Sequence, residues 1–268
     1  MKYCVSARQP YSVLELADEI IVNYSDKDKI FDFIEKLPDK SIILHYTPGD
    51  VLDISLWKMY DEKFKGGFCV ACHSLSDVDL FNENGIKWYW PYPITSFYEL
   101  QMVLRLGPSQ IVLGAPLFFS LSVVSNCAPE VKKRIVVNKA KPNYVPAVGR
   151  FEAIVGQWVR PEDVAAYEPY IDVMEFDCVG EHPLKKEETL LHIYKENKFW
   201  PGNLNLLIDD LNINVDNRAI PNEFGERRIN CEQRCERGGS CHFCDMAFQF
   251  AERLRSFSST STQQKEEN

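Results

Sequence analysis

The chain has 268 residues, of which 45% are hydrophobic, and its 30 Lys and Arg against 39 Asp and Glu give a net charge of −9. This apolar content supports a sizeable core and excludes wholesale disorder. The acidic balance argues against a general nucleic-acid-binding protein. It does not exclude a local basic groove.

Short apolar runs recur along the chain and predict the strands of a parallel sheet. Most are continuously apolar rather than alternating, which is typical of strands buried on both faces. The runs span residues 2–7, 19–24, 41–47, 68–74, 86–92, 110–116, 134–138, 153–159 and 173–177.

Amphipathic stretches between these runs predict helices. Residues 26–37 place their apolar side chains on one helical face, and Ser96 is a candidate N-cap for a helix over 96–106. Pro161 suits the first position of a helix over 161–167. Alternating strands and helices favour a TIM-like (βα)8 barrel. An open doubly wound sheet is the alternative, although the glycine-rich nucleotide fingerprints of such sheets are absent.

The alternation of predicted strands and helices ends after about residue 210. Apolar periodicity continues over 203–217, and 218–228 reads as a connecting loop through Pro221 and Gly225. We therefore expect a barrel over 1–226, a cysteine-rich metal-binding segment with a short helix over 227–255, and a disordered tail over 256–268.

Cysteine usage gives the strongest chemical signal. The N-terminus lacks the apolar stretch of a secretory signal and no run of about 18 apolar residues occurs, so we expect a cytoplasmic chain without a membrane span. Structural disulfides are rare in that compartment. Yet four of the nine cysteines follow the pattern Cys231-x3-Cys235-x5-Cys241-x2-Cys244. Four thiolates are the ligands of tetrahedral Zn²⁺ or of a [4Fe–4S] cluster, and a redox-active or merely cysteine-rich loop is the alternative.

Polar residues at the ends of the predicted strands form the second signal, because the active site of a TIM barrel lies at the carboxyl ends of its strands. His45 and His73 occupy equivalent points of successive strands and are candidate acid–base groups, as is Glu175. The alternative for each is a side chain satisfied by hydrogen bonds within the fold.

Three more residues are candidate substrate-binding groups: Gln157, Arg160 and Trp90. Arg160 suits an anionic group through its bidentate fork, or else a salt bridge to Glu162 or Asp163. Trp90 suits stacking on a planar ligand, or else core packing.

Cys69 and Cys72 form a C-x-x-C motif on a predicted strand rather than at a helix start. Residues i and i+3 of an extended strand point to opposite faces, so we expect no disulfide between them.

Three stretches carry a resemblance to the U32 peptidase-like family, which includes ubiquinone-hydroxylation and tRNA/rRNA-hydroxylation proteins. Residues 17–22 (ADEIIV) resemble its early GAD-x-V strand. Residues 157–163 (QWVRPED), followed by Tyr167 and 171–176 (IDVMEF), are similar to its late (R/S)-P-E-x-V…Y…D-x-x-K-(I/F) segment. Residues 231–244 are similar to a four-cysteine element at the end of some members. The chain departs from the family at Glu175, where a Lys is expected, and in lacking the long central cysteine motif.

This resemblance implies a TIM-like barrel with a cysteine-ligated [4Fe–4S] cluster that hydroxylates an RNA base or an aromatic small molecule. Two alternatives stay open: a zinc-bearing barrel in the style of base-exchange transferases, and a non-catalytic adaptor whose Cys4 site is a zinc staple or docks a protein partner. A catalytic cluster has to approach the barrel mouth, whereas a structural one sits on the flank or bottom. Arg227 and Arg228, which precede Cys231 and could reach an anionic ligand, favour the mouth.

Overall fold

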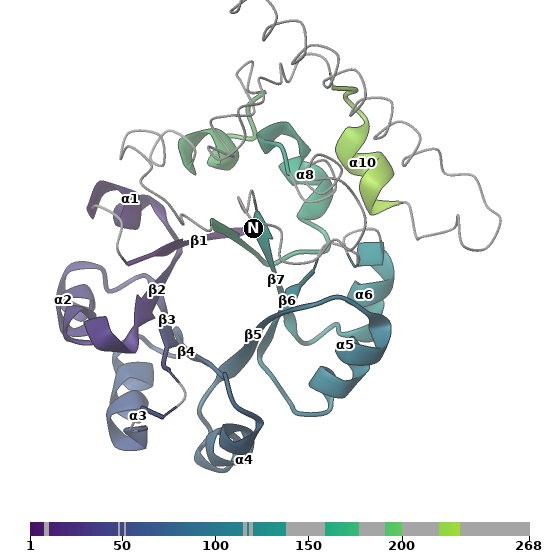
Figure 1. Cartoon of the computed structure of the whole chain (residues 1–268). Helices are drawn as coiled ribbons and strands as arrows, with labels where there is room; N and C mark the ends of the chain where they lie inside the picture. The colour runs from purple at the N-terminus through teal and green to yellow at the C-terminus, as the bar shows by residue number, and fades with distance from the viewer. Residues whose placement is uncertain are drawn as a thin grey trace, which may run out of the picture.

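The backbone forms a closed barrel of eight parallel strands (Figure 1). The computed structural model describes residues 1–7, 11–47, 49–50, 52–114, 117, 120–137, 159–176, 191–199 and 220–230. Each strand pairs with the next in sequence, and β8 pairs with β1 to close the ring. The strands are β1 Lys2–Ser6, β2 Glu19–Asn23, β3 Ser41–His45, β4 Phe68–Ala71, β5 Trp88–Ile94, β6 Gln110–Leu113, β7 Lys132–Val137 and β8 Val173–Phe176.

The closed order confirms the TIM-like barrel and shows that the alternative of an open doubly wound sheet is wrong. β7 pairs directly with β8, so no strand stands between them. Of the predicted strand over 153–159, only Val159 falls within the described residues, and it is not in a strand.

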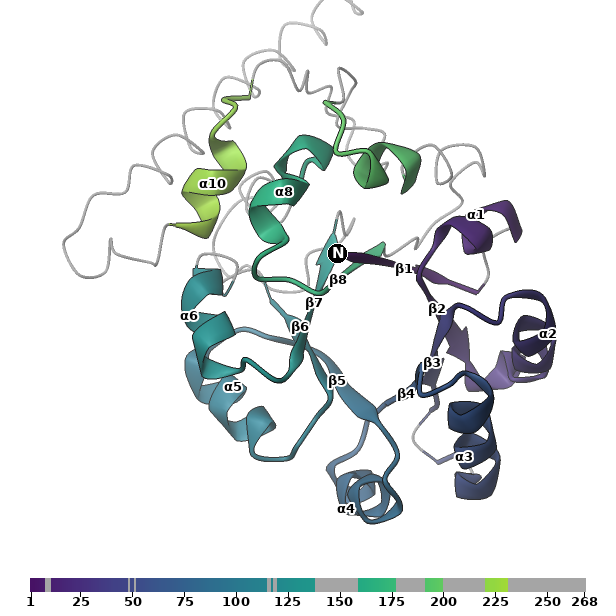
Figure 2. The ribbon, with the colours of Figure 1, turned by 180° about the vertical axis from the view of Figure 1, so that it is seen from behind.

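Helices surround the barrel (Figure 2). Ser96 caps α5 as expected, because its hydroxyl accepts a hydrogen bond from the backbone N–H of Glu99 at 3.2 Å. Pro161 opens a short 3₁₀ turn over Pro161–Asp163 that leads into α8. The labelled helices are α1 Tyr11–Leu16, α2 Asp28–Lys36, α3 Ile54–Lys63, α4 Leu75–Asn84, α5 Phe97–Leu104, α6 Leu121–Cys127, α8 Val164–Tyr167 and α10 Phe224–Ile229, and residues 191–195 are also helical. None of the helices in the described ranges has the length and apolarity needed to cross a bilayer.

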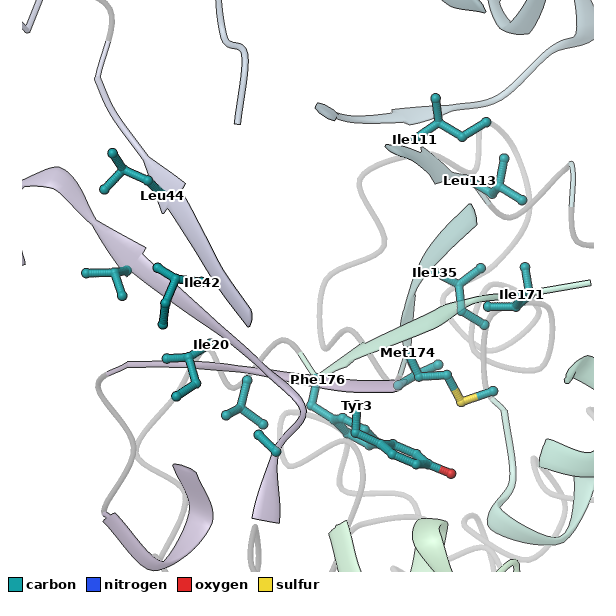
Figure 3. Close-up of a cluster of buried hydrophobic side chains, with 14 of the residues drawn as sticks. Tyr3, Ile20, Ile42, Leu44, Ile111, Leu113, Ile135, Ile171, Met174 and Phe176 are labelled. Atoms are coloured by element: carbon teal, nitrogen blue, oxygen red, sulfur yellow. The ribbon is translucent and has the colours of Figure 1, made fainter. Parts of the chain in front are cut away.

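Strand residues alternate between two apolar layers. The larger layer lies between the barrel and its helices and includes Ile20, Ile42, Ile111 and Met174 (Figure 3). A smaller layer fills the barrel interior, with Ile43, Cys69, Ala71, Tyr89 and Val112. This alternation is the period of two that strand geometry imposes.

The two layers also separate the cysteines of the C-x-x-C motif. Cys69 belongs to the interior layer and Cys72 to the outer one, and both are free thiols. The prediction that they face opposite sides of the sheet is therefore confirmed.

The expectation of a connecting loop over 218–228 is wrong, because residues 224–229 form the helix α10. Phe224 and Ile229 are buried, which supplies the apolar face that a short helix needs. Gly225 permits close packing, since a Cβ at this position would lie 2.6 Å from the Asp163 carboxyl carbon. The helix also crosses the expected domain boundary at 226/227.

α10 lies outside α8, as Figure 1 and Figure 2 both show, and two contacts show that it runs in the same direction. At its start, Arg160 donates to the backbone carbonyl of Pro221; near its end, the buried Arg228 donates to the Tyr167 hydroxyl. Residues 168–172 connect the end of α8 to the first residue of β8. The end of α10 therefore lies toward the amino-terminal end of the barrel. The cysteines of 231–244 and the expected tail over 256–268 fall outside the described residues.

Candidate functional site

The barrel interior carries a column of polar side chains. Residues that are paired in register on neighbouring strands face the same side of the sheet. Cys4 is paired with Glu19 and Glu175, and Ala71 of the interior layer is paired with Tyr89. The polar members of this inward set include Cys4, Glu19, His45, Tyr89, Gln110, Arg134 and Glu175.

Arg134 is the centre of this column and is completely buried. Its Nη2 donates to Glu19 Oε2 at 2.6 Å and to Gln110 Oε1 at 3.0 Å, and its Nη1 donates to Glu175 Oε2 at 3.2 Å. A buried cation is tolerated only with such partners, because desolvation of an unpaired charge costs several kcal/mol. The guanidinium carbon also lies 5.2 Å from the Tyr89 ring centroid.

His45 ends β3 at the carboxyl-terminal mouth and is joined to Tyr89. Its Nε2 lies 2.5 Å from Tyr89 Oη, and the Tyr89 side chain is buried. Burial is the main cause that lowers the pKa of His45 from 6.5 to about 4, and repulsion from the protonated form of His73 and from Arg134 lowers it further. His45 is therefore neutral at physiological pH.

His73 follows β4 and lies beside His45 at the mouth. The ring centroids are 5.4 Å apart, and His73 Nδ1 lies 3.4 Å from Tyr92 Oη. Burial lowers the pKa of His73 below 6.5, so this imidazole is also neutral at pH 7. The structure therefore brings together the two histidines predicted from the sequence.

The backbone around His73 is held by a second hydrogen-bonded pair. Tyr46 Oη donates to Asp77 Oδ2 at 2.6 Å and accepts from the His73 backbone N–H at 3.2 Å. Burial and the Asp77 hydrogen bond raise the pKa of Tyr46, so its hydroxyl stays protonated. This pair ties the strand ends of β3 and β4 to the start of α4.

Glu175 joins the column from β8, with a side chain that is 17% exposed. Its carboxylate is held by Arg134 and lies close enough to Tyr89 to raise the pKa of that phenol, after the larger effect of burial. The structure therefore connects Glu175 to His45 only indirectly, through its hydrogen bond with Arg134 and its charge near Tyr89.

Two more of the predicted site residues, Arg160 and Trp90, fall within the described residues. Arg160 is 1% exposed and contacts Asp163 through Nε and Nη2, each at 2.7 Å, which is the salt bridge raised as the alternative to substrate binding. Trp90 packs against the outer apolar layer and contacts Tyr92, with ring centroids 5.5 Å apart. Gln157, Cys231, Cys235, Cys241 and Cys244 lie outside the described residues.

Sequence reasoning missed Arg134, Glu19, Gln110 and Tyr89. A signal was present, because Glu19 and Arg134 are charges that begin runs that otherwise predict fully buried strands. A charge in such a run requires a buried partner. The sequence does not say which partner, since Glu19 and Arg134 are 115 residues apart.

No cluster of three or more His, Cys, Asp or Glu with metal-binding geometry occurs within the described ranges. Cys4, Cys69 and Cys72 are buried free thiols, and burial raises the pKa of Cys69 and Cys72 to about 11. A metal proposal therefore depends on the donor set of 231–244.

No protein-family model matches the chain, and the search of curated proteins finds no significant relative. Solved structures of other barrels are similar. A 3-keto-L-gulonate-6-phosphate decarboxylase from Vibrio cholerae shares 11% identity, with 75% of this chain and 99% of that one covered, at a TM-score of 0.43. An orotidine 5'-monophosphate decarboxylase from Sulfolobus solfataricus shares 13%, covering 73% and 98%, at 0.40. A U32 peptidase shares 15%, covering 68% and 94%, at 0.41. These similarities concern the fold and say nothing about activity.

Proposed function

We propose that this chain is a TIM-barrel enzyme whose acid–base chemistry takes place at the mouth, around His45 and His73. The observation that carries the proposal is the contact between these neutral imidazoles at the carboxyl ends of β3 and β4, where barrel enzymes place their chemistry. Burial of ionisable groups at the base of that mouth supports it, because perturbed titration is typical of catalytic sites.

The finer proposal is a U32 peptidase-like protein that hydroxylates an aromatic or nucleobase-containing substrate, with a [4Fe–4S] cluster held by Cys231, Cys235, Cys241 and Cys244. The four thiols are the donor set that such a cluster takes, and when bound the cluster would supply electron transfer. Tyr92, which contacts His73, offers a partly exposed aromatic face for a planar ligand.

The direction of α10 favours a second candidate role for the cysteines, a structural metal staple of zinc or iron. Cys231 follows Asn230 at the end of α10, so an ion bound by Cys231 would lie within about 9 Å of the Asn230 Cα. That end of α10 lies beside Tyr167, at the end of α8. Arg228, invoked for an anionic ligand at the mouth, is instead buried against Tyr167.

The test uses the full chain purified without oxygen, with iron, sulfide and zinc measured per chain. Iron with equimolar sulfide and a brown colour supports the cluster, and stoichiometric zinc supports a staple or a base-exchange transferase. Absence of both metals contradicts every metal proposal.

Ligand-observed NMR with nucleobases, nucleosides and phenols then tests the mouth. We expect ligands that bind the parent chain to lose binding in His73→Gln and to keep it in His192→Gln, a matched change at an exposed histidine. Absence of binding, or equal binding to both variants, overturns the proposed site.

A further inference from the structure

The two ring nitrogens of His45 are chemically distinct. Nε2 is bonded to Tyr89 Oη, whereas Nδ1 has no partner among the described residues. If Nε2 carried the proton, the Tyr89 hydroxyl hydrogen would lack an acceptor within the described part of the chain, and a buried unmade hydrogen bond costs about 1–3 kcal/mol. The phenol therefore donates, and the lone pair of Nε2 accepts.

Tyr89 can donate this hydrogen bond because its phenol stays protonated. Burial and the nearby Glu175 carboxylate raise its pKa well above 10. Arg134 also holds the Tyr89 ring, because its guanidinium carbon lies 5.2 Å from the ring centroid and its Nη1 and Nη2 donors are held by Glu19, Gln110 and Glu175. Arg134 is in this sense a positioning residue for Tyr89.

A neutral imidazole that accepts at Nε2 has its hydrogen on Nδ1. We propose that His45 uses this Nδ1–H to donate a hydrogen bond to a carbonyl oxygen of the substrate, while His73 removes a proton from the neighbouring carbon. The substrate class is then a planar compound with an enolisable carbonyl. This inference rests on the proposed function, because it assigns roles within the same mouth.

The step balances without an oxidant or reductant. The C–H bond next to the carbonyl breaks, its electron pair forms the C=C bond of the enolate, and the carbonyl π pair moves onto oxygen. The proton goes to a ring nitrogen of His73, and the oxyanion is stabilised by the His45 Nδ1–H. A neutral imidazole is a known donor for developing enolate charge. His73 suits the base, since its ring is the more accessible of the two.

The assignment of the His45 hydrogen can be tested without any substrate. In the ¹⁵N-histidine-labelled full chain, we expect His45 to show the Nδ1–H tautomer unchanged between about pH 5.5 and 8. Tyr89→Phe should leave a mixture of tautomers, while Tyr98→Phe, a change on the exposed face of α5, should not. An Nε2–H tautomer in the parent chain overturns the inference.

The proton transfer is tested by deuterium exchange from D₂O into phenylpyruvate and acetophenone, followed by ¹H NMR. We expect exchange above the buffer rate, reduced about 10²-fold or more in His73→Gln and in His45→Phe, and unchanged in His192→Gln. Exchange that is no faster than in buffer, or is equal in all variants, overturns the enolisation step. Bound ligands without exchange would leave the proposed site standing and remove only this inference.

Discussion

Arg134 Nη2 lies 2.6 Å from Glu19 Oε2 across the inside of the barrel. The two residues sit on β7 and β2, which are not neighbours in the sheet, since β8 and β1 lie between them. The ion pair therefore bridges the barrel interior, where a TIM barrel usually holds branched apolar side chains.

The first prediction concerns this bridge. Arg134→Met should lower the free energy of unfolding by about 3–5 kcal/mol, because it leaves the 1% exposed Glu19 carboxylate without its buried partner. Glu19→Gln in the same chain should restore a large part of the loss. Urea denaturation of the single and double variants measures both effects, with Lys132→Met at an exposed position of β7 as control. Equal stability of the Arg134→Met and parent chains would contradict a bridge of this kind.

A second prediction follows from the neutral state of His45. The pKa of His45 is 6.5 in the unfolded chain and about 4 in the folded one. Between pH 4 and pH 6.5 the unfolded chain therefore binds more protons than the folded chain. The contribution of His45 to the free energy of unfolding is fully present above about pH 6.5. It is lost as the pH falls toward 4, and the loss reaches roughly 3 kcal/mol. Denaturation at pH 7 and pH 5 should show a smaller loss in His45→Gln than in the parent chain or His192→Gln. Parallel losses in all three would show that His45 titrates normally.

The packing of α10 gives a third prediction. Gly225→Ala should destabilise the chain by about 1–3 kcal/mol, because the added Cβ would lie 2.6–2.9 Å from atoms of the Asp163 side chain. Asp163 is also held by Arg160 and has little room to move. Glu226→Ala, on the exposed face of the same helix, should change stability by less than about 0.5 kcal/mol. Similar thermal unfolding of both variants would mean that α10 does not pack closely against Asp163.

The fourth prediction separates a catalytic cluster from a structural one. Cys235→Ser should lower the metal content per chain, because it removes one of four thiolates. If the metal is a staple near the end of α10, the melting temperature should fall while ligand binding at the mouth persists in the folded fraction. If the metal is catalytic, activity should be lost with the melting temperature nearly unchanged. Full metal content in Cys235→Ser would exclude Cys235 as a ligand.

Much of the fold follows from local pattern. Continuous apolar runs with helical stretches between them predict buried parallel strands, and all eight strands of the barrel fall within or overlap the predicted runs. Ser96 marks the start of its helix through a local hydrogen bond, and Pro161 marks the start of its 3₁₀ turn through its fixed φ. Neither signal needs a contact with a distant part of the chain. The helix within 218–228 does not follow from local pattern, because Gly225 signals a turn locally, whereas contact with Asp163 makes a small residue necessary within a helix.

The sequence by itself determined the residue types at the mouth, since the end of a parallel strand is visible in the hydrophobic pattern. For that reason His45 and His73 are predictable from the sequence alone. Only the tertiary structure decided what holds them. Tyr89 is 44 residues from His45, and Arg134 is 115 residues from Glu19. Closure of the barrel brings these pairs together, and burial then sets the pKa of each group. The hydrophobic pattern of the sequence indicates that a charge is buried. It does not indicate which residue across the barrel is the partner of that charge.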